Sequence, residues 1–110
     1  MSRQIVVYVS PWCYTSQDTQ RALEEWGLPA TFINIKEDRA AAARVKEWVG
    51  FESVPTVLIA EGDGLEPVEP PAPLPRGASP RGVDRGSMIT EANRSQLRTW
   101  LVGHGMLAEG

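Results

Sequence analysis

The sequence predicts an α/β fold in which strands and helices alternate along a chain of 110 residues. An uninterrupted run of β-prone apolar side chains at residues 5–9 gives way to a helical pattern. A second strand pattern and a second helical pattern follow in the same order. A strand, helix, strand order of this length implies a parallel pair of strands joined by a right-handed crossover.

The first three elements are defined by the spacing of their apolar residues. The run at residues 5–9 is typical of a strand covered on both faces, so we place it at the centre of the sheet. A helix is expected over residues 13–26, with an apolar stripe at Thr19, Ala22, Leu23 and Trp26. Gly27 and Pro29 end this helix, and residues 30–35 are expected to form the second strand.

The remaining elements follow the same logic. Asp38 is placed to cap a second helix, whose buried stripe is expected to be Ala41, Val45, Trp48 and Val49. Pro55 opens a third strand that runs to residue 60, since proline is tolerated at the start of a strand. Residues 91–102 are expected to form the last helix, ending at Gly103, with a stripe of Leu97, Trp100 and Leu101. We expect Trp26, Trp48 and Trp100 in the core.

Residues 62–86, the proline-rich segment, interrupt this pattern. The segment holds six of the nine prolines and has almost no aliphatic periodicity. We expect an excursion from a single domain that spans residues 1–110, because no second apolar cluster accompanies it. It is either a tolerated long loop or a functional segment. In the second case residues 64–84 would present stiff polyproline to a protein partner or fold over the site as a lid.

Composition excludes several classes of protein. The chain has one cysteine, so it cannot form an internal disulfide, and one histidine, so no zinc-type ligand set or other metal site is expected. This pattern suits a reducing compartment, and the short N-terminal apolar run resembles neither a signal peptide nor a membrane span. The net charge of −3 leaves no basic footprint for nucleic acid or membrane. We therefore expect a cytoplasmic monomer without a cofactor.

Cys13 is the candidate nucleophile. It lies where the first strand gives way to the first helix, and the unpaired N–H groups and positive dipole of a helix N-terminus favour a thiolate there. The alternative is an inert cysteine buried as a small apolar side chain.

Three motifs now resemble one family. The motif Trp12-Cys13-Tyr14-Thr15-Ser16 is similar to the active site of glutaredoxin-like proteins of the thioredoxin fold. The motif Ser53-Val54-Pro55-Thr56-Val57 resembles their cis-proline loop, and Gly86-Ser87-Met88-Ile89-Thr90 resembles a fourth strand of the mycoredoxin and NrdH-redoxin group. The resemblance implies a four-stranded mixed sheet flanked by three helices, with the proline-rich segment inserted between strands three and four.

The resemblance also implies a reaction. Cys13 would attack a mixed disulfide between a protein and a low-molecular-weight thiol, which serves as co-substrate. A cis Val54-Pro55 bond would hold the Val54 main chain beside the sulfur to receive the substrate. Ser16 occupies the place of a resolving cysteine and is expected to support the thiolate by a hydrogen bond, or else to be a solvated helix residue.

The aromatic residues beside the cysteine have two interpretations. Trp12 and Tyr14 wall the substrate groove in the resembling families, or they pack on the sheet. Glu52 and Ser53 precede the Val-Pro dipeptide where the mycoredoxin group often has arginine followed by serine or threonine. We expect the Glu52 carboxylate to repel an acidic thiol such as glutathione, so that a neutral or less anionic thiol, or a protein disulfide, is preferred.

Two other functions remain open. Monothiol glutaredoxins with Cys-Gly-Phe-Ser carry an iron-sulfur cluster between two chains, but Tyr14-Thr15 replaces Gly-Phe in this sequence. A non-enzymatic adaptor would bind its partners through the proline-rich segment. The first choice is a monothiol thiol-disulfide oxidoreductase that acts in cell redox homeostasis.

Overall fold

The computed structural model describes residues 3–74 and 77–108. Its elements in chain order are β1 (Arg3–Val9), α1 (Tyr14–Glu25), β2 (Ala30–Asn34), α2 (Arg39–Val49), β3 (Thr56–Glu61), β4 (Met88–Thr90) and α3 (Arg94–Gly103). The four strands form a mixed sheet in the order β2-β1-β3-β4. β1 pairs with β2 in parallel and with β3 antiparallel, and β4 is antiparallel to β3. The expected fold class, with β1 central, is confirmed.

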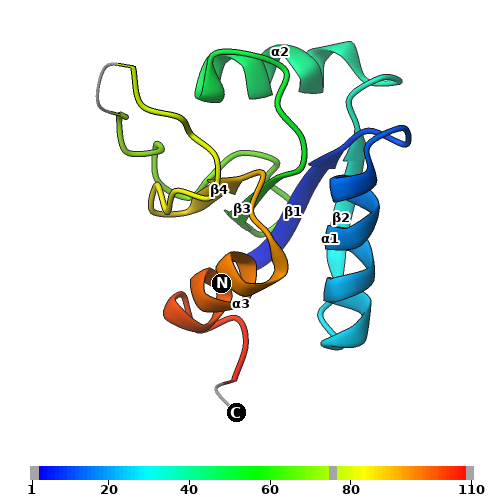
Figure 1. Cartoon of the computed structure of the whole chain (residues 1–110), viewed down its shortest axis with the longest axis vertical. Coiled ribbons are helices and arrows are strands. Elements are labelled where there is room, and N and C mark those ends of the chain that lie inside the picture. The colour runs from blue at the N-terminus through cyan, green and yellow to red at the C-terminus, as the bar shows by residue number, and fades with distance from the viewer. Residues whose placement is uncertain (1–2, 75–76, 109–110) are drawn as a thin grey trace.

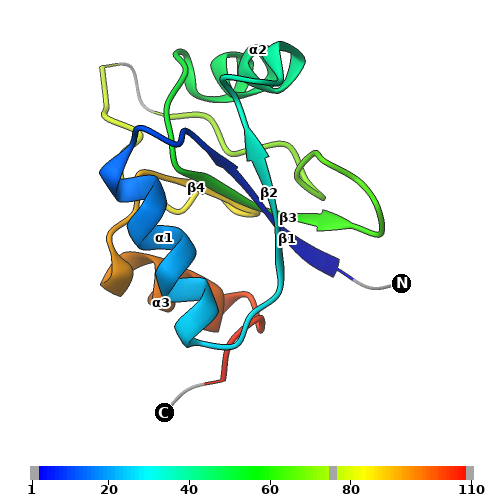
Figure 2. The ribbon, with the colours of Figure 1, turned by 90° about the vertical axis from the view of Figure 1, so that its right-hand side faces the viewer.

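Helices cover both faces of the sheet. α1 and α3 pack on one face and α2 lies on the other (Figures 1 and 2). Alternate residues of β1 contribute to the two sides: Ile5 and Val7 pack with α1 and α3, and Val6 and Tyr8 pack with α2. This alternation follows from the period of two in a strand, and it explains why both faces of β1 are apolar.

The helix ends are set by local capping. Asp38 caps α2 as expected, accepting the N–H of Ala41 at 3.0 Å. The last helix ends at Gly103 as expected, but its predicted start was wrong, because α3 begins at Arg94. Asn93 forms a capping box with Gln96 there, which fixes the start of the helix three residues later than expected.

The three tryptophans predicted in the core are not equally buried. Trp100 is buried, whereas Trp26 and Trp48 are only partly buried against the two apolar clusters. Trp26 is the C-cap of α1 and Trp48 lies in the last turn of α2, and ends of helices reach the rim of the layers. The Trp48 ring instead packs edge-on against Tyr8, with ring centroids 5.6 Å apart.

The proline-rich segment lies between β3 and β4 in the chain and away from α1 (Figure 1). Its described residues are tied to the core by hydrogen bonds. Val68 N–H donates to the carbonyl of Ile59 at 2.9 Å, and the Tyr8 hydroxyl donates to the carbonyl of Leu65. Pro75, the last residue of the expected polyproline run, lies outside the described residues.

Within the part of the chain that the structure describes, no helix has both the length and the apolar character needed to cross a bilayer.

Candidate active site

Cys13 lies at the end of a tight turn that connects β1 to α1. Its N–H donates to the carbonyl of Ser10 at 3.1 Å, and the Gln17 side-chain amide donates to the carbonyl of Pro11 at 3.0 Å. Cys13 is the N-cap of α1 in an extended conformation. A helix cannot pair the N–H groups of its own first turn, so the thiol lies at an end of α1 that favours negative charge.

The Cys13 thiol faces the loop before β3. Its Sγ lies 3.8 Å from the carbonyl oxygen of Val54, to which the thiol can donate. The Val54-Pro55 peptide bond is cis, as the resemblance implied. Cys13 is partly exposed, so the alternative of a cysteine buried as a small apolar side chain is wrong. The Val54 N–H has no hydrogen-bond partner among residues 3–74 and 77–108, and it remains available to an incoming chain.

The two aromatic neighbours of Cys13 project into solvent. Trp12 is 87% exposed and Tyr14 is 78% exposed. The alternative that these rings pack on the sheet is therefore wrong. Phe51, in the loop that leads to Val54, is also exposed, although no role was predicted for it. Trp12 and Tyr14 flank Cys13 in the sequence, and Phe51 precedes the cis-proline loop. Their exposed rings form apolar surface that a substrate can cover.

Ser16 is buried, contrary to the alternative of a solvated residue. Its Oγ accepts the backbone N–H of Ser10 at 3.4 Å. This contact closes the turn that carries Cys13 against the first turn of α1. The hydrogen bond seen for Ser16 is therefore with the backbone of the turn, where we had expected one with the sulfur.

The Glu52 carboxylate is paired with an arginine. Its two carboxylate oxygens accept hydrogen bonds from Arg39 at 3.1 and 3.3 Å. The Arg39 guanidinium lowers the pKa of the Glu52 carboxyl, so Glu52 is ionised but partly neutralised. The expected repulsion of acidic thiols is weakened accordingly. Arg39 precedes Glu52 by thirteen residues and opens α2, so only the fold brings the pair together.

Ser53 is buried, and it connects the cis-proline loop to the end of β4. Its Oγ donates to Glu91 Oε2 at 2.5 Å, and its carbonyl accepts the Thr56 hydroxyl at 2.9 Å. The N–H of Glu91 donates to the carbonyl of Pro55 at 2.7 Å. Glu91 had no predicted role, because nothing in the local sequence pairs it with Ser53, 38 residues earlier.

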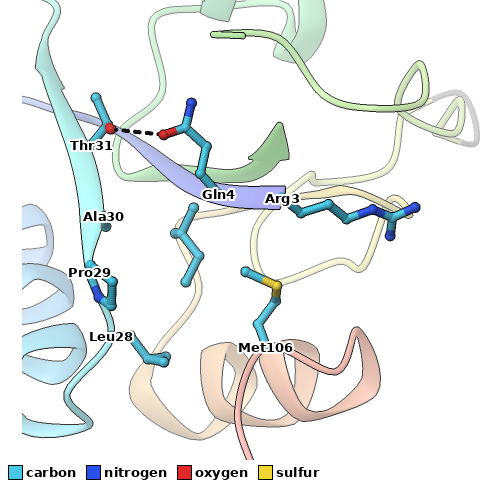
Figure 3. Close-up of a pocket in the computed structure, with 8 residues that line it drawn as sticks. Arg3, Gln4, Leu28, Pro29, Ala30, Thr31 and Met106 are labelled. Atoms are coloured by element: carbon cyan, nitrogen blue, oxygen red, sulfur yellow. Dashed lines mark hydrogen bonds between the residues drawn. The ribbon is translucent and has the colours of Figure 1, made fainter. Parts of the chain in front are cut away.

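The candidate site lies at the surface, around the Cys13 thiol and the main chain of Val54. A pocket of about 250 Å³ does exist, but it is lined by the first residues of β1, by the chain entering β2 and by Met106 after α3 (Figure 3). Thr31 donates to the side chain of Gln4 across its rim. Cys13 follows the other end of β1, so this pocket is not part of the candidate site.

Two features define the class of protein. The first is a cysteine at the N-terminus of α1 that faces a cis-proline loop. The second is a mixed sheet in the order β2-β1-β3-β4 with helices on both faces. Together these features define a thioredoxin-like fold. A family model described as Glutaredoxin matches residues 5–63, which is more than half of the chain and reaches from β1 past the end of β3. The chain therefore belongs to the glutaredoxin family, whose function is of the thiol-disulfide oxidoreductase type. A search of curated proteins finds no match.

Proposed function

We propose that the chain is a monothiol oxidoreductase that reduces mixed disulfides between proteins and a low-molecular-weight thiol. The observation that carries this proposal is the placement of Cys13 Sγ 3.8 Å from the Val54 carbonyl, at the cis-proline loop. The sulfur is accessible, lies at a helix N-terminus, and is next to the main chain of Val54, whose N–H has no partner among the described residues. These are the requirements for attack on a disulfide by an aligned thiolate.

The reaction runs in two exchanges. The Cys13 thiolate attacks the small-thiol sulfur of the mixed disulfide, a new Cys13 disulfide forms, and the protein leaves as a thiolate that takes up a proton. A second small thiol, as its thiolate, then attacks the small-thiol sulfur bound to Cys13. This step releases the Cys13 thiolate and a symmetrical small-molecule disulfide, so the second thiol supplies the reducing electrons.

Ser16 makes this a monothiol mechanism. A hydroxyl cannot displace sulfur from a disulfide, so resolution needs an external thiol. The contact of Ser16 with Ser10 indicates that its contribution to catalysis is to hold the turn of Cys13.

The remaining site residues bind the substrate in this proposal. The Val54 N–H and carbonyl pair with an extended substrate chain next to Pro55, and Trp12 and Tyr14 cover its side chains. Ser53 holds the loop in place through its hydrogen bonds with Glu91 and Thr56. Glu52 and Arg39 present a paired acid and base near the loop, which favours a neutral or weakly anionic thiol over glutathione.

The test uses a peptide whose single cysteine is disulfide-linked to a small thiol. We expect the wild type to form a Cys13 adduct of the small thiol, detected by mass spectrometry, and to turn over with excess free thiol. Cys13→Ser should abolish both. Ser16→Ala should retain turnover, and Ser95→Ala, an exposed serine on α3, is its matched control. Turnover by Cys13→Ser, or no adduct on the wild type, contradicts the proposal.

Two other measurements separate the alternative functions. A cluster carrier would purify brown under anaerobic conditions and show visible absorbance. When residues 64–84 are deleted, an adaptor that binds through them would lose its partner, whereas an oxidoreductase would keep thiol exchange. The deletion also removes Arg81, which contacts Glu91, so point substitutions are the sharper tool.

A further inference from the structure

Glu91 has an unusual backbone at a position next to the cis-proline loop. Among the described residues it is the one non-glycine residue with a left-handed conformation, at φ 49°. A residue that carries a side chain adopts this region only where the surrounding contacts hold it there. At Glu91 one such contact is the hydrogen bond from its N–H to the Pro55 carbonyl at 2.7 Å.

The Glu91 carboxylate supplies two more contacts. Oε2 accepts the hydroxyl of buried Ser53 at 2.5 Å, and Oε1 accepts from the Arg81 guanidinium at 3.3 Å. Ser53 and Pro55 are the immediate neighbours of Val54. Glu91 therefore holds the loop on both sides of the residue whose carbonyl lies against Cys13 Sγ.

Arg81 connects this contact to the proline-rich segment. Arg81 forms a bridge with Thr90, and the N–H of Gly82 donates to the Thr90 carbonyl at 2.7 Å. The returning part of the proline-rich segment is thus attached to β4 at the residue before Glu91. Arg81 is itself largely exposed, so it adds a modest electrostatic contribution to a position that the backbone contacts define.

We propose that Glu91 is a positioning residue for the main-chain N–H and carbonyl of Val54, and that the proline-rich segment keeps Glu91 in place through Arg81 and Gly82. The proposal rests on the proposed function, because these two groups matter for turnover only if a substrate chain pairs with them. Glu91 acts through Ser53 and Pro55. Its loss therefore changes how an extended substrate binds and leaves the intrinsic reactivity of Cys13 unchanged.

Three substitutions separate the contributions. Glu91→Gly suits the left-handed backbone and removes the carboxylate, so it does not strain the fold. Glu91→Gln keeps an oxygen that can accept the Ser53 hydroxyl and removes the charge that attracts Arg81. Arg81→Ala removes the contact from the proline-rich segment. The matched controls are Arg21→Ala on α1 and Glu47→Gln on α2, both exposed.

The measurements are KM and kcat for the peptide mixed disulfide and the rate of Cys13 alkylation by iodoacetamide. For Glu91→Gly we expect KM to rise about tenfold, as for loss of a hydrogen bond to a charged group. For Arg81→Ala we expect about a twofold rise. Glu91→Gln should stay within roughly twofold of the wild type because the Ser53 contact remains. Alkylation rates and the two controls should match the wild type.

An unchanged KM in Glu91→Gly overturns the proposal. So does a fall in kcat that is matched by an equal fall in the alkylation rate of Cys13. A readout independent of turnover is the amide signal of Val54 in ¹⁵N-¹H NMR spectra. It should move in Glu91→Gly and Arg81→Ala and stay in place in Arg21→Ala, and an unmoved signal in Glu91→Gly also overturns the proposal. A wild type that does not turn over the peptide refutes the proposed function alone, because the Val54 signal still reports on Glu91.

Discussion

The substitution Arg85→Met removes a buried cation that joins the proline-rich segment to α2. Arg85 is only 7% exposed. Its Nη1 donates to the carbonyl of Trp48 at 2.7 Å, and its Nε donates to the carbonyl of Ala72 at 2.8 Å. Trp48 lies in the last turn of α2, where the helix itself leaves carbonyls unpaired, so Arg85 serves as a distant cap.

The cost of the substitution can be worked out from these two contacts. Each hydrogen bond from a charged donor contributes about 1.5–3 kcal/mol. Burial also lowers the pKa of Arg85, which shows that removing the guanidinium from water opposes part of this gain. Methionine keeps much of the apolar volume, and part of the exposed carbonyl surface regains water. We therefore expect the free energy of unfolding to fall by about 2 kcal/mol, a large share of the roughly 5–15 kcal/mol that such domains have.

Urea denaturation followed by tryptophan fluorescence and by far-UV circular dichroism measures this change. The expected loss corresponds to a decrease in Tm of about 10 °C for a domain of this size. Arg21→Met, at an exposed position on α1, is the matched control and should change the stability by less than about 0.5 kcal/mol. Equal stabilities of Arg85→Met and Arg21→Met would refute the view that Arg85 anchors the segment.

Two further predictions concern titrating groups. Burial raises the pKa of Tyr8, so the folded state favours its neutral hydroxyl; the stability from this preference is complete below the pKa of about 10 of an unfolded tyrosine and is lost as the pH rises through the higher folded value. Urea midpoints should fall above about pH 10, less steeply in Tyr8→Phe, and equal slopes would contradict this reasoning. Glu52→Gln leaves the Arg39 guanidinium without its acidic partner, so kcat/KM for a glutathione mixed disulfide should rise about twofold to fivefold, whereas Arg39→Ala should lower it. Glu47→Gln is the control, and an unchanged ratio in Glu52→Gln would remove this acid from the account of thiol preference.

The candidate site was predictable from sequence where short-range patterns define it. Cys13 follows a strand and precedes a helix, and the structure places it as the N-cap. The Val-Pro dipeptide has the expected cis bond, and its loop faces the sulfur. The exposure of Trp12 and the burial of Ser16 were left open, because a residue on a short turn can face either side without changing the pattern.

The contacts around the loop were not predictable. Glu52 was identified as an acid near the groove, but its partner Arg39 is on the first turn of another element. Glu91 contacts Ser53 from 38 residues away, and Arg85 reaches Trp48 across 37. The last two contacts depend on where the chain lies after the proline-rich segment. That segment has almost no aliphatic periodicity, so its path cannot be predicted from apolar spacing.

By itself, the amino-acid order determined the strands and helices, the central place of β1 and the position of the single thiol at the start of α1. These follow from apolar spacing and capping, which act over a few residues. Only the tertiary structure decided which charges neutralise one another, and that the proline-rich segment is tied to the cis-proline loop through Glu91. The physical reason is that these interactions join residues far apart in the chain, and their partners are selected by packing of the whole sheet.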